Sequence, residues 1–117
     1  MRFRISKIGS THARALFLTG ERFDAERALH IGLVHRVVNN EAALDRAVDD
    51  AVALIKTSGP EAVRECKKLI EHVASHDLPD AVPYTIEAIA SRRVSKEGQD
   101  GMSAFLKKEK PPWASGK

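Results

Sequence analysis

A twenty-residue stretch from Thr19 to Val38 most constrains how this 117-residue chain can fold. Its sequence, TGERFDAERALHIGLVHRVV, predicts a turn, a helix capped by Asp24, a stop at Gly32 and a short strand over residues 33–38. The rest of the sequence predicts no second strand. Because a single strand cannot satisfy its own backbone hydrogen bonds, it needs a sheet outside this chain or a strand of another subunit. The stretch therefore indicates part of a larger fold.

The remainder of the chain is predicted to be helical, since apolar residues recur at helical spacing between polar or proline-containing breaks. An irregular lead-in is expected over residues 1–10. Helices are predicted over residues 11–18, 25–31, 41–56, 60–75, 79–92 and 96–108. N-caps are expected at Ser10, Asn40, Asp77 and Ser95, and Pro60 suits a first helical position. The fold class is therefore mainly α.

Three residues near the C-terminus indicate close packing. Gly98 and Gly101 lie inside the last predicted helix, although glycine is a poor helix former, and this favours a close approach of other atoms to the backbone. Trp113 follows two prolines that end the helix. We expect its large ring to anchor the tail of the chain.

Composition excludes several classes of protein. The net charge is +3 with both signs interspersed, and no aromatic residues alternate with the basic ones, so nucleic-acid binding is not expected. No apolar run reaches the roughly 18 residues of a membrane span, so no membrane partner is expected. The single cysteine, Cys66, excludes an intramolecular disulfide and fits a reducing cytoplasm, which is the expected location.

The residues alone do not point to a catalytic or metal site. His72 and His76 stand four positions apart, but no third ligand has suitable spacing, so surface polar roles are favoured and no metal is expected. Cys66 lies on an apolar helix stripe and is expected to be a small buried hydrophobe. The lysines at 107, 108 and 110 fit either a solvated helix end or a phosphate contact. No pair of carboxylates is marked as general acid and base.

Three motifs, in order, resemble the C-terminal part of the enoyl-CoA hydratase/isomerase (crotonase) family. The first is ALFLTGERF from Ala15 to Phe23, followed by Ala25 and Ala28. The second is IGLV from Ile31 to Val34, leading into Arg36-Val37-Val38. The third is EGQDGMSAFLKK from Glu97 to Lys108, running into Lys110-Pro111. Gly59-Pro60, Ala62 and Lys67 also fit, so the resemblance covers the chain from about Ile8.

The resemblance implies a C-terminal helical trimerisation region of a crotonase-like α/β fold, spanning residues 11–117, with the ββα spiral core absent. Family members add water to an unsaturated acyl-CoA or shift its double bond, with no tightly bound cofactor, and they form trimers or hexamers. The catalytic glutamates and oxyanion hole belong to segments upstream of the matched part, so no catalytic residue is carried over. The resemblance does imply two binding residues. Lys108 stands at a position that contacts nucleotide phosphates of coenzyme A, and Ile89 stands at one that closes over the ligand.

Two functions are therefore expected. In the first, the chain is the oligomerisation and coenzyme A-site-covering part of an enoyl-CoA hydratase/isomerase-like protein of fatty-acid or branched acyl-CoA metabolism, inactive alone. In the second, it is a stand-alone non-catalytic assembly or interaction module, because each predicted helix has an apolar face and no core domain is visible. The choice of acyl group, and of hydratase or isomerase chemistry, depends on residues outside the matched region.

Overall fold

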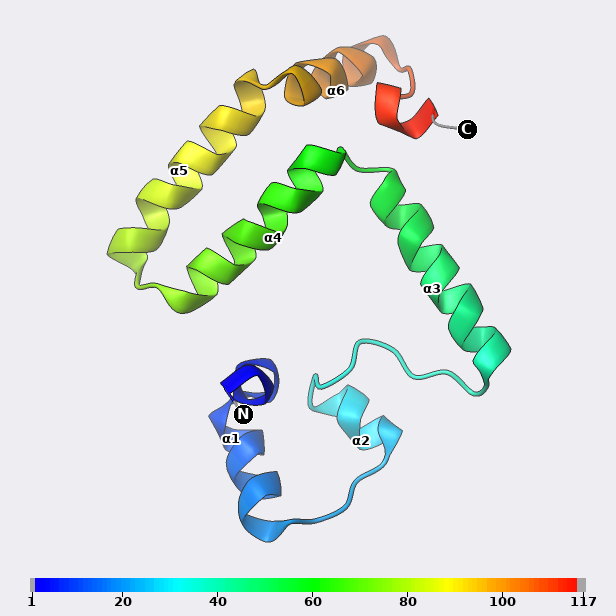
Figure 1. Ribbon diagram of the computed structural model, residues 1–117, viewed down its shortest axis with the longest axis vertical. Coiled ribbons are helices and arrows are strands. Elements are labelled where there is room, and N and C mark those ends of the chain that lie inside the picture. Colours follow the sequence, from blue (N-terminus) through cyan, green and yellow to red (C-terminus); the bar gives the residue numbers. More distant parts are fainter. Residues whose placement is uncertain (1, 116–117) are drawn as a thin grey trace. The chain divides into compact units, whose positions relative to one another are not determined.

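A computed structural model describes residues 2–115, which form six α-helices and one 3-10 helix (Figure 1). The chain divides into two compact units, residues 1–46 and residues 47–117. The helices are α1 (Arg2–Thr19), α2 (Ala25–His30), α3 (Glu41–Lys56), α4 (Pro60–Ser75), α5 (Leu78–Val94), α6 (Lys96–Lys107) and η1 (Pro112–Ser115). The predicted mainly α class is confirmed. No helix in the described part of the chain has both the length and the apolarity needed to cross a membrane.

The first unit is built on α1 and α2, which close over a small apolar core. Ile8, Ala13, Leu16 and Ile31 are buried together, and Leu33 packs against them. Asp24 caps α2 as predicted, accepting a 2.8 Å hydrogen bond from the Arg27 amide. The helix ends before Gly32, whose φ of 77° is a left-handed conformation that glycine adopts without strain.

Two predictions for this unit are wrong. Residues 2–8 are helical rather than irregular, and the helix is broken only at Gly9, where φ is 73° and ψ is 166°. Ile8 is 6% exposed, so its burial in the core stabilises a helical turn that local propensity does not favour. Met1 lies outside the described residues.

The predicted strand over residues 33–38 is also absent from the described part of the chain. The amides of Leu33 and Val34 both donate to the Ala28 carbonyl, at 2.9 and 3.4 Å, so the segment folds back on the end of α2. A β-branched run forms a strand only when a neighbouring strand supplies the ladder, and residues 2–115 offer none.

The second unit contains α4, α5 and α6 together with η1. Helices α4 and α5 lie side by side as an antiparallel hairpin, and α6 continues from the end of α5 (Figure 1). Pro60 is the first residue of α4, as predicted. Asp77 precedes α5 at the N-cap position, but its side chain makes no capping hydrogen bond.

Helix α3 runs over the predicted residues and is capped by Asn40, whose side-chain oxygen accepts a 2.8 Å hydrogen bond from the Ala43 amide. None of its residues is buried. Four apolar side chains at helical spacing are each more than two-fifths exposed: Leu44, Val48, Val52 and Ile55. This face is apolar by sequence and is open to solvent in the described structure.

Candidate functional site

Lys108 directly follows α6, at its C-cap, in an unusual backbone conformation. Its φ is 57° and its ψ is 36°, and it is the one non-glycine residue with a positive φ among residues 2–115. Its amide donates to the carbonyls of Ala104 and Phe105, and the next amide, of Glu109, donates to Ala104 at 2.9 Å. Left-handed backbone costs a residue with a Cβ about 1 kcal/mol or more, and helices usually place glycine there. The exposed Lys108 is therefore held at some cost in stability.

The start of α6 is fixed by three contacts. Ser95 caps the helix as predicted, its hydroxyl oxygen accepting from the Gly98 amide at 3.0 Å. Gly98 lies so close to the Arg92 carbonyl oxygen that a Cβ there would collide with it. The Glu97 side chain extends from α6 to the first turn of α4, where its carboxylate accepts hydrogen bonds from the amides of Glu61 at 2.9 Å and Ala62 at 2.8 Å.

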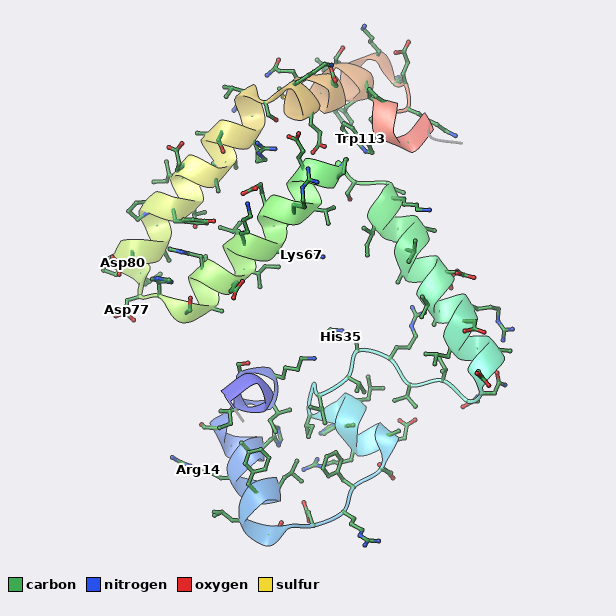
Figure 2. All side chains as sticks on the ribbon, viewed as in Figure 1. Arg14, His35, Lys67, Asp77, Asp80 and Trp113 are labelled. Atoms are coloured by element: carbon green, nitrogen blue, oxygen red, sulfur yellow. The ribbon has the colours of Figure 1, made fainter. Side chains whose placement is uncertain are left out.

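The tail is anchored by Trp113, as predicted. The indole Nε1–H of Trp113, the residue labelled near the end of the chain in Figure 2, donates to the Thr57 carbonyl at 3.1 Å. A Cβ on Gly101 would stand 2.9 Å from the ring, so the glycine makes room for the indole against α6. Close packing at Gly98 and Gly101 is thus confirmed. Glu97 and Trp113 bind either side of Gly59, at the junction of α3 and α4.

Ile89 lies on α5 and is 70% exposed, so it is not a core residue of the described chain. It lines a groove of about 240 Å³ between α4 and α5, whose walls are mostly apolar: Ala62, Glu65, Cys66, Leu69, Thr85, Ala88, Ile89 and Arg92. Lys108 does not line this groove. Ile89 therefore lies on α5 and Lys108 just beyond the end of α6, outside the groove that Ile89 lines.

Cys66 is exposed in the wall of this groove, and the expected burial is wrong. The apolar stripe of α4 that carries it has no buried residue, because α5 covers the stripe only in part. Glu65 lies beside it in the same wall. Its carboxylate accepts a 2.8 Å hydrogen bond from Lys68, and this bond holds the pKa of Glu65 below its ordinary range.

His72 and His76 take part in ring stacking. Their rings stack at 3.9 Å, and His72 also stacks on Tyr84 of α5 at 3.9 Å. Parallel rings direct their nitrogens side by side rather than at one ion. No group of three potential ligands gathers anywhere in residues 2–115.

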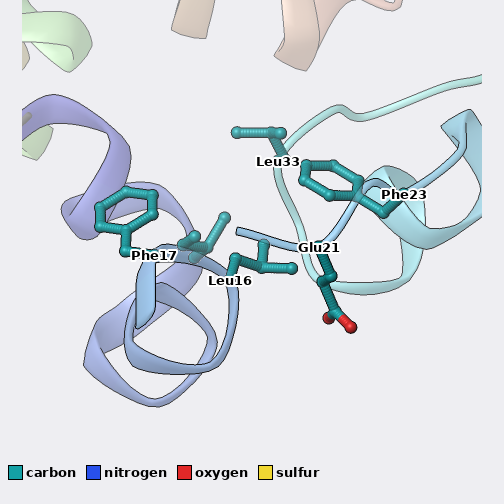
Figure 3. Close-up of a pocket in the computed structure, with 6 residues that line it drawn as sticks. Leu16, Phe17, Glu21, Phe23 and Leu33 are labelled. Carbon is teal, nitrogen blue, oxygen red and sulfur yellow. The ribbon is translucent and has the colours of Figure 1, made fainter. Parts of the chain in front are cut away.

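The first unit contains a second hollow, of about 300 Å³, over its apolar core. Figure 3 shows Leu16, Phe17, Phe23 and Leu33 around it, with the Glu21 carboxylate pointing away from Leu33. Glu21 is the one titratable residue of this lining, so the hollow lacks a second polar group with which a general acid or base could work.

The contacts of Glu97 and Arg92 were not predicted from the sequence. The Arg92 guanidinium pairs with the Glu61 carboxylate at 2.8 Å, while its Nε is buried with no hydrogen-bond partner among the described residues. One signal could have indicated Glu97. Helix α4 starts at Pro60 with Gly59 as its N-cap residue, and glycine has no side chain that could accept from the free amides of the first turn. These amides therefore need an acceptor from another part of the chain.

Comparison with known proteins identifies the family. The family model for enoyl-CoA hydratase/isomerase matches residues 1–116. The chain belongs to the enoyl-CoA hydratase/isomerase family. Among curated relatives, a short-chain-enoyl-CoA hydratase of Clostridium acetobutylicum is 30% identical over 108 residues, covering 92% of this chain and 41% of the relative.

Solved structures of the family agree in fold. An enoyl-CoA hydratase/isomerase from Marinobacter aquaeolei is 32% identical, with a TM-score of 0.88 over 97% of this chain and 43% of that one. AtuE from Pseudomonas aeruginosa is also 32% identical, with a TM-score of 0.90 over 97% of this chain and 44% of that one. The chain thus has the helical structure of family members and spans about two-fifths of their length.

Proposed function

We propose that this chain is the C-terminal helical part of an enoyl-CoA hydratase/isomerase-like protein, where it contributes to a coenzyme A thioester site and to assembly. Its family acts on CoA thioesters, and an acyl-CoA is therefore the proposed ligand. The proposed location is the cytoplasm. Hydratase and isomerase chemistry both remain within the proposal, since the family description includes both.

The observation that carries the coenzyme A contact is the backbone of Lys108. A residue that retains a side chain at φ 57°, on an exposed helix end, gives up stability that glycine would provide. A binding role for the Lys108 ammonium group would explain why lysine stands here in place of glycine. The neighbouring Lys107 and Lys110 add positive charge to the same helix end, which favours phosphate. Lys108 is proposed to contact the nucleotide phosphates, and the exposed Ile89 to close over the ligand from another subunit.

A coenzyme A titration followed by NMR tests this contact. Lys108→Ala should weaken binding about fivefold, as expected for an exposed charged contact. Lys110→Ala is the matched control, because it removes one charge from the same segment without touching the left-handed position. Equal losses in both variants would mean that coenzyme A responds only to net charge, and no loss in either would refute the phosphate contact.

The proposed assembly into trimers or hexamers is supported by surface area. The structure exposes 9894 Å². Two separate compact proteins of about 5 and 8 kDa, matching the two units, would together expose only about 7,600 Å². The excess of about 2,300 Å² per chain is available for contact with the rest of the proposed larger protein and with neighbouring subunits, and it is large enough to include one side of an obligate interface. Much of it is apolar, including Leu18, Leu54, Phe105 and Leu106, each more than two-thirds exposed.

No catalytic residue is proposed in this chain, and we expect no hydration of crotonyl-CoA by the 117-residue polypeptide. A spectrophotometric assay of that reaction tests the expectation. Turnover clearly above the rate in buffer would contradict it.

A second candidate is a stand-alone, non-catalytic assembly module. The observation that favours it is α3, which exposes an apolar stripe and has no buried residue. Light scattering after size-exclusion chromatography separates the candidates when combined with the titration. A stable oligomer that does not bind coenzyme A would favour the module, whereas a monomer would contradict it.

A further inference from the structure

Two contacts at the junction of α3 and α4 hold the ends of the segment that carries Lys108. On the N-terminal side, Glu97 is the second residue of α6 and binds the first turn of α4. On the C-terminal side, Trp113 of η1 binds the Thr57 carbonyl. The chain between Glu97 and Trp113 is thus attached at both ends to residues 57–62, and Lys108 lies between the attachments.

The first attachment replaces a cap that α4 lacks. Gly59 is the N-cap residue and has no side chain with which to bond the free amides. Both oxygens of the Glu97 carboxylate accept from those amides instead, and the negative charge lies at the positive end of the helix dipole. Gly59 is buried, and a Cβ there would collide with the Glu97 carboxylate. Glycine at this position leaves the room that Glu97 needs.

Because α6 runs from Glu97 toward Lys108, its orientation determines the position of Lys108. The helix has 12 residues and is therefore about 18 Å long. A tilt of about 10° at its start would move its far end by about 3 Å over that length. Hydrogen bonds to charged groups span only about 2.7–3.2 Å between heavy atoms. A small loss of orientation at Glu97 therefore displaces Lys108 by about the length of such a bond, and its flexible side chain must then reorganise to keep the contact.

We propose that Glu97 and Trp113 are positioning residues for Lys108, acting through the orientation of α6 and of the tail. The inference rests on the proposed function, in which Lys108 contacts the phosphates of coenzyme A. Neither positioning residue touches the ligand. Glu97 fixes the start of α6, and Trp113, seated against Gly101, fixes its middle and the return of the chain.

A double-mutant cycle with coenzyme A as the titrant tests this inference. Glu97→Gln leaves the side chain the same size but removes the charge and one acceptor, and Trp113→Phe removes the Nε1–H donor while an aromatic ring remains. Each should weaken coenzyme A binding about fivefold, the same factor as Lys108→Ala. In the Lys108→Ala background each should have no further effect, because the contact that it positions is already gone. Glu71→Gln, an exposed change on α4, is the control and should bind as wild type.

Amide hydrogen exchange shows whether the attachment itself has opened. In Glu97→Gln the amides of Glu61 and Ala62 should exchange faster, while those in the middle of α5 should not change. Because Trp113→Phe leaves the Glu97 contact intact, it still tests the inference if Glu97→Gln proves unfolded.

The outcomes distinguish the inference from the proposed function. Equal losses from Glu97→Gln in both backgrounds would indicate general structural damage and would overturn the positioning role. A loss with Lys108→Ala but not with Glu97→Gln or Trp113→Phe would overturn it and leave the coenzyme A contact standing. If Lys108→Ala itself binds as wild type, or if wild type does not bind, the proposed contact fails and the positioning role fails with it.

Discussion

Replacing Lys108 by glycine should make the protein more stable. The φ of 57° costs a residue with a Cβ about 1–2 kcal/mol relative to ordinary backbone, and glycine avoids this cost. Glycine also gives the unfolded chain more freedom, which offsets about 0.5–1 kcal/mol of the gain. The net increase in the free energy of unfolding should be about 0.5–1 kcal/mol. For a domain of this size that raises the Tm by about 2–6 °C.

Lys107→Gly is the matched control. Lys107 is the last residue of α6 and has helical backbone, so glycine there should cost up to about 1 kcal/mol. Both variants remove one lysine, and they should therefore differ in stability but not in charge. Thermal unfolding followed by circular dichroism measures both. If Lys108→Gly lowers the Tm as Lys107→Gly does, the reasoning from the left-handed conformation is refuted. Lys108→Gly should also weaken coenzyme A binding as Lys108→Ala does, so that its stability rises while its affinity for coenzyme A falls.

Three further predictions concern local features. Gly98→Ala should lower the free energy of unfolding by about 1–3 kcal/mol in urea titrations, because its Cβ would collide with the Arg92 carbonyl; the exposed Ser103→Ala should change it little, and equal effects would contradict the close approach. Asn40→Ala should cost about 1 kcal/mol through the lost cap of α3, whereas Asn39→Ala should cost less in the same measurement. Lys68→Met should raise the pKa of Glu65 toward its ordinary range in an NMR pH titration, because the hydrogen bond that favours the charged carboxylate is gone. In the wild type, this bond stabilises the fold above the unfolded pKa of Glu65, and the stabilisation is lost as the pH falls through the lower folded pKa.

Helix positions could be predicted from the sequence because their signals are local. The cap at Asn40 and the proline at position 60 lie within a turn of the helices that they start, and α3 and α4 run over the predicted residues. Gly20, with a left-handed φ of 65°, directly follows the last residue of α1. Family membership, predicted from three motifs, is confirmed by the family match.

The failed predictions depend on contacts that sequence spacing does not reveal. Residues 33–38 have strand propensity, but a strand also needs a partner, and propensity says nothing of that. Residues 2–8 are held helical by the burial of Ile8 against residues much later in the chain. Cys66 lies on an apolar stripe as predicted, but burial of a stripe depends on what covers it. At the candidate site, the motif suggests Lys108, and its role stays a prediction; its left-handed backbone and the bonds of Glu97 to α4 could not be predicted from spacing.

The distant cap of α4 has a consequence for synthesis. Glu97 follows Ala62 by 35 residues, so the ribosome makes the start of α4 well before the residue that completes it. At about 5–20 residues per second, the interval is about 2–7 seconds. During that time the amides of Glu61 and Ala62 can bond only to water, and the turn that they begin is prone to fray. Helix α4 can therefore reach its final form only after Glu97 has been translated.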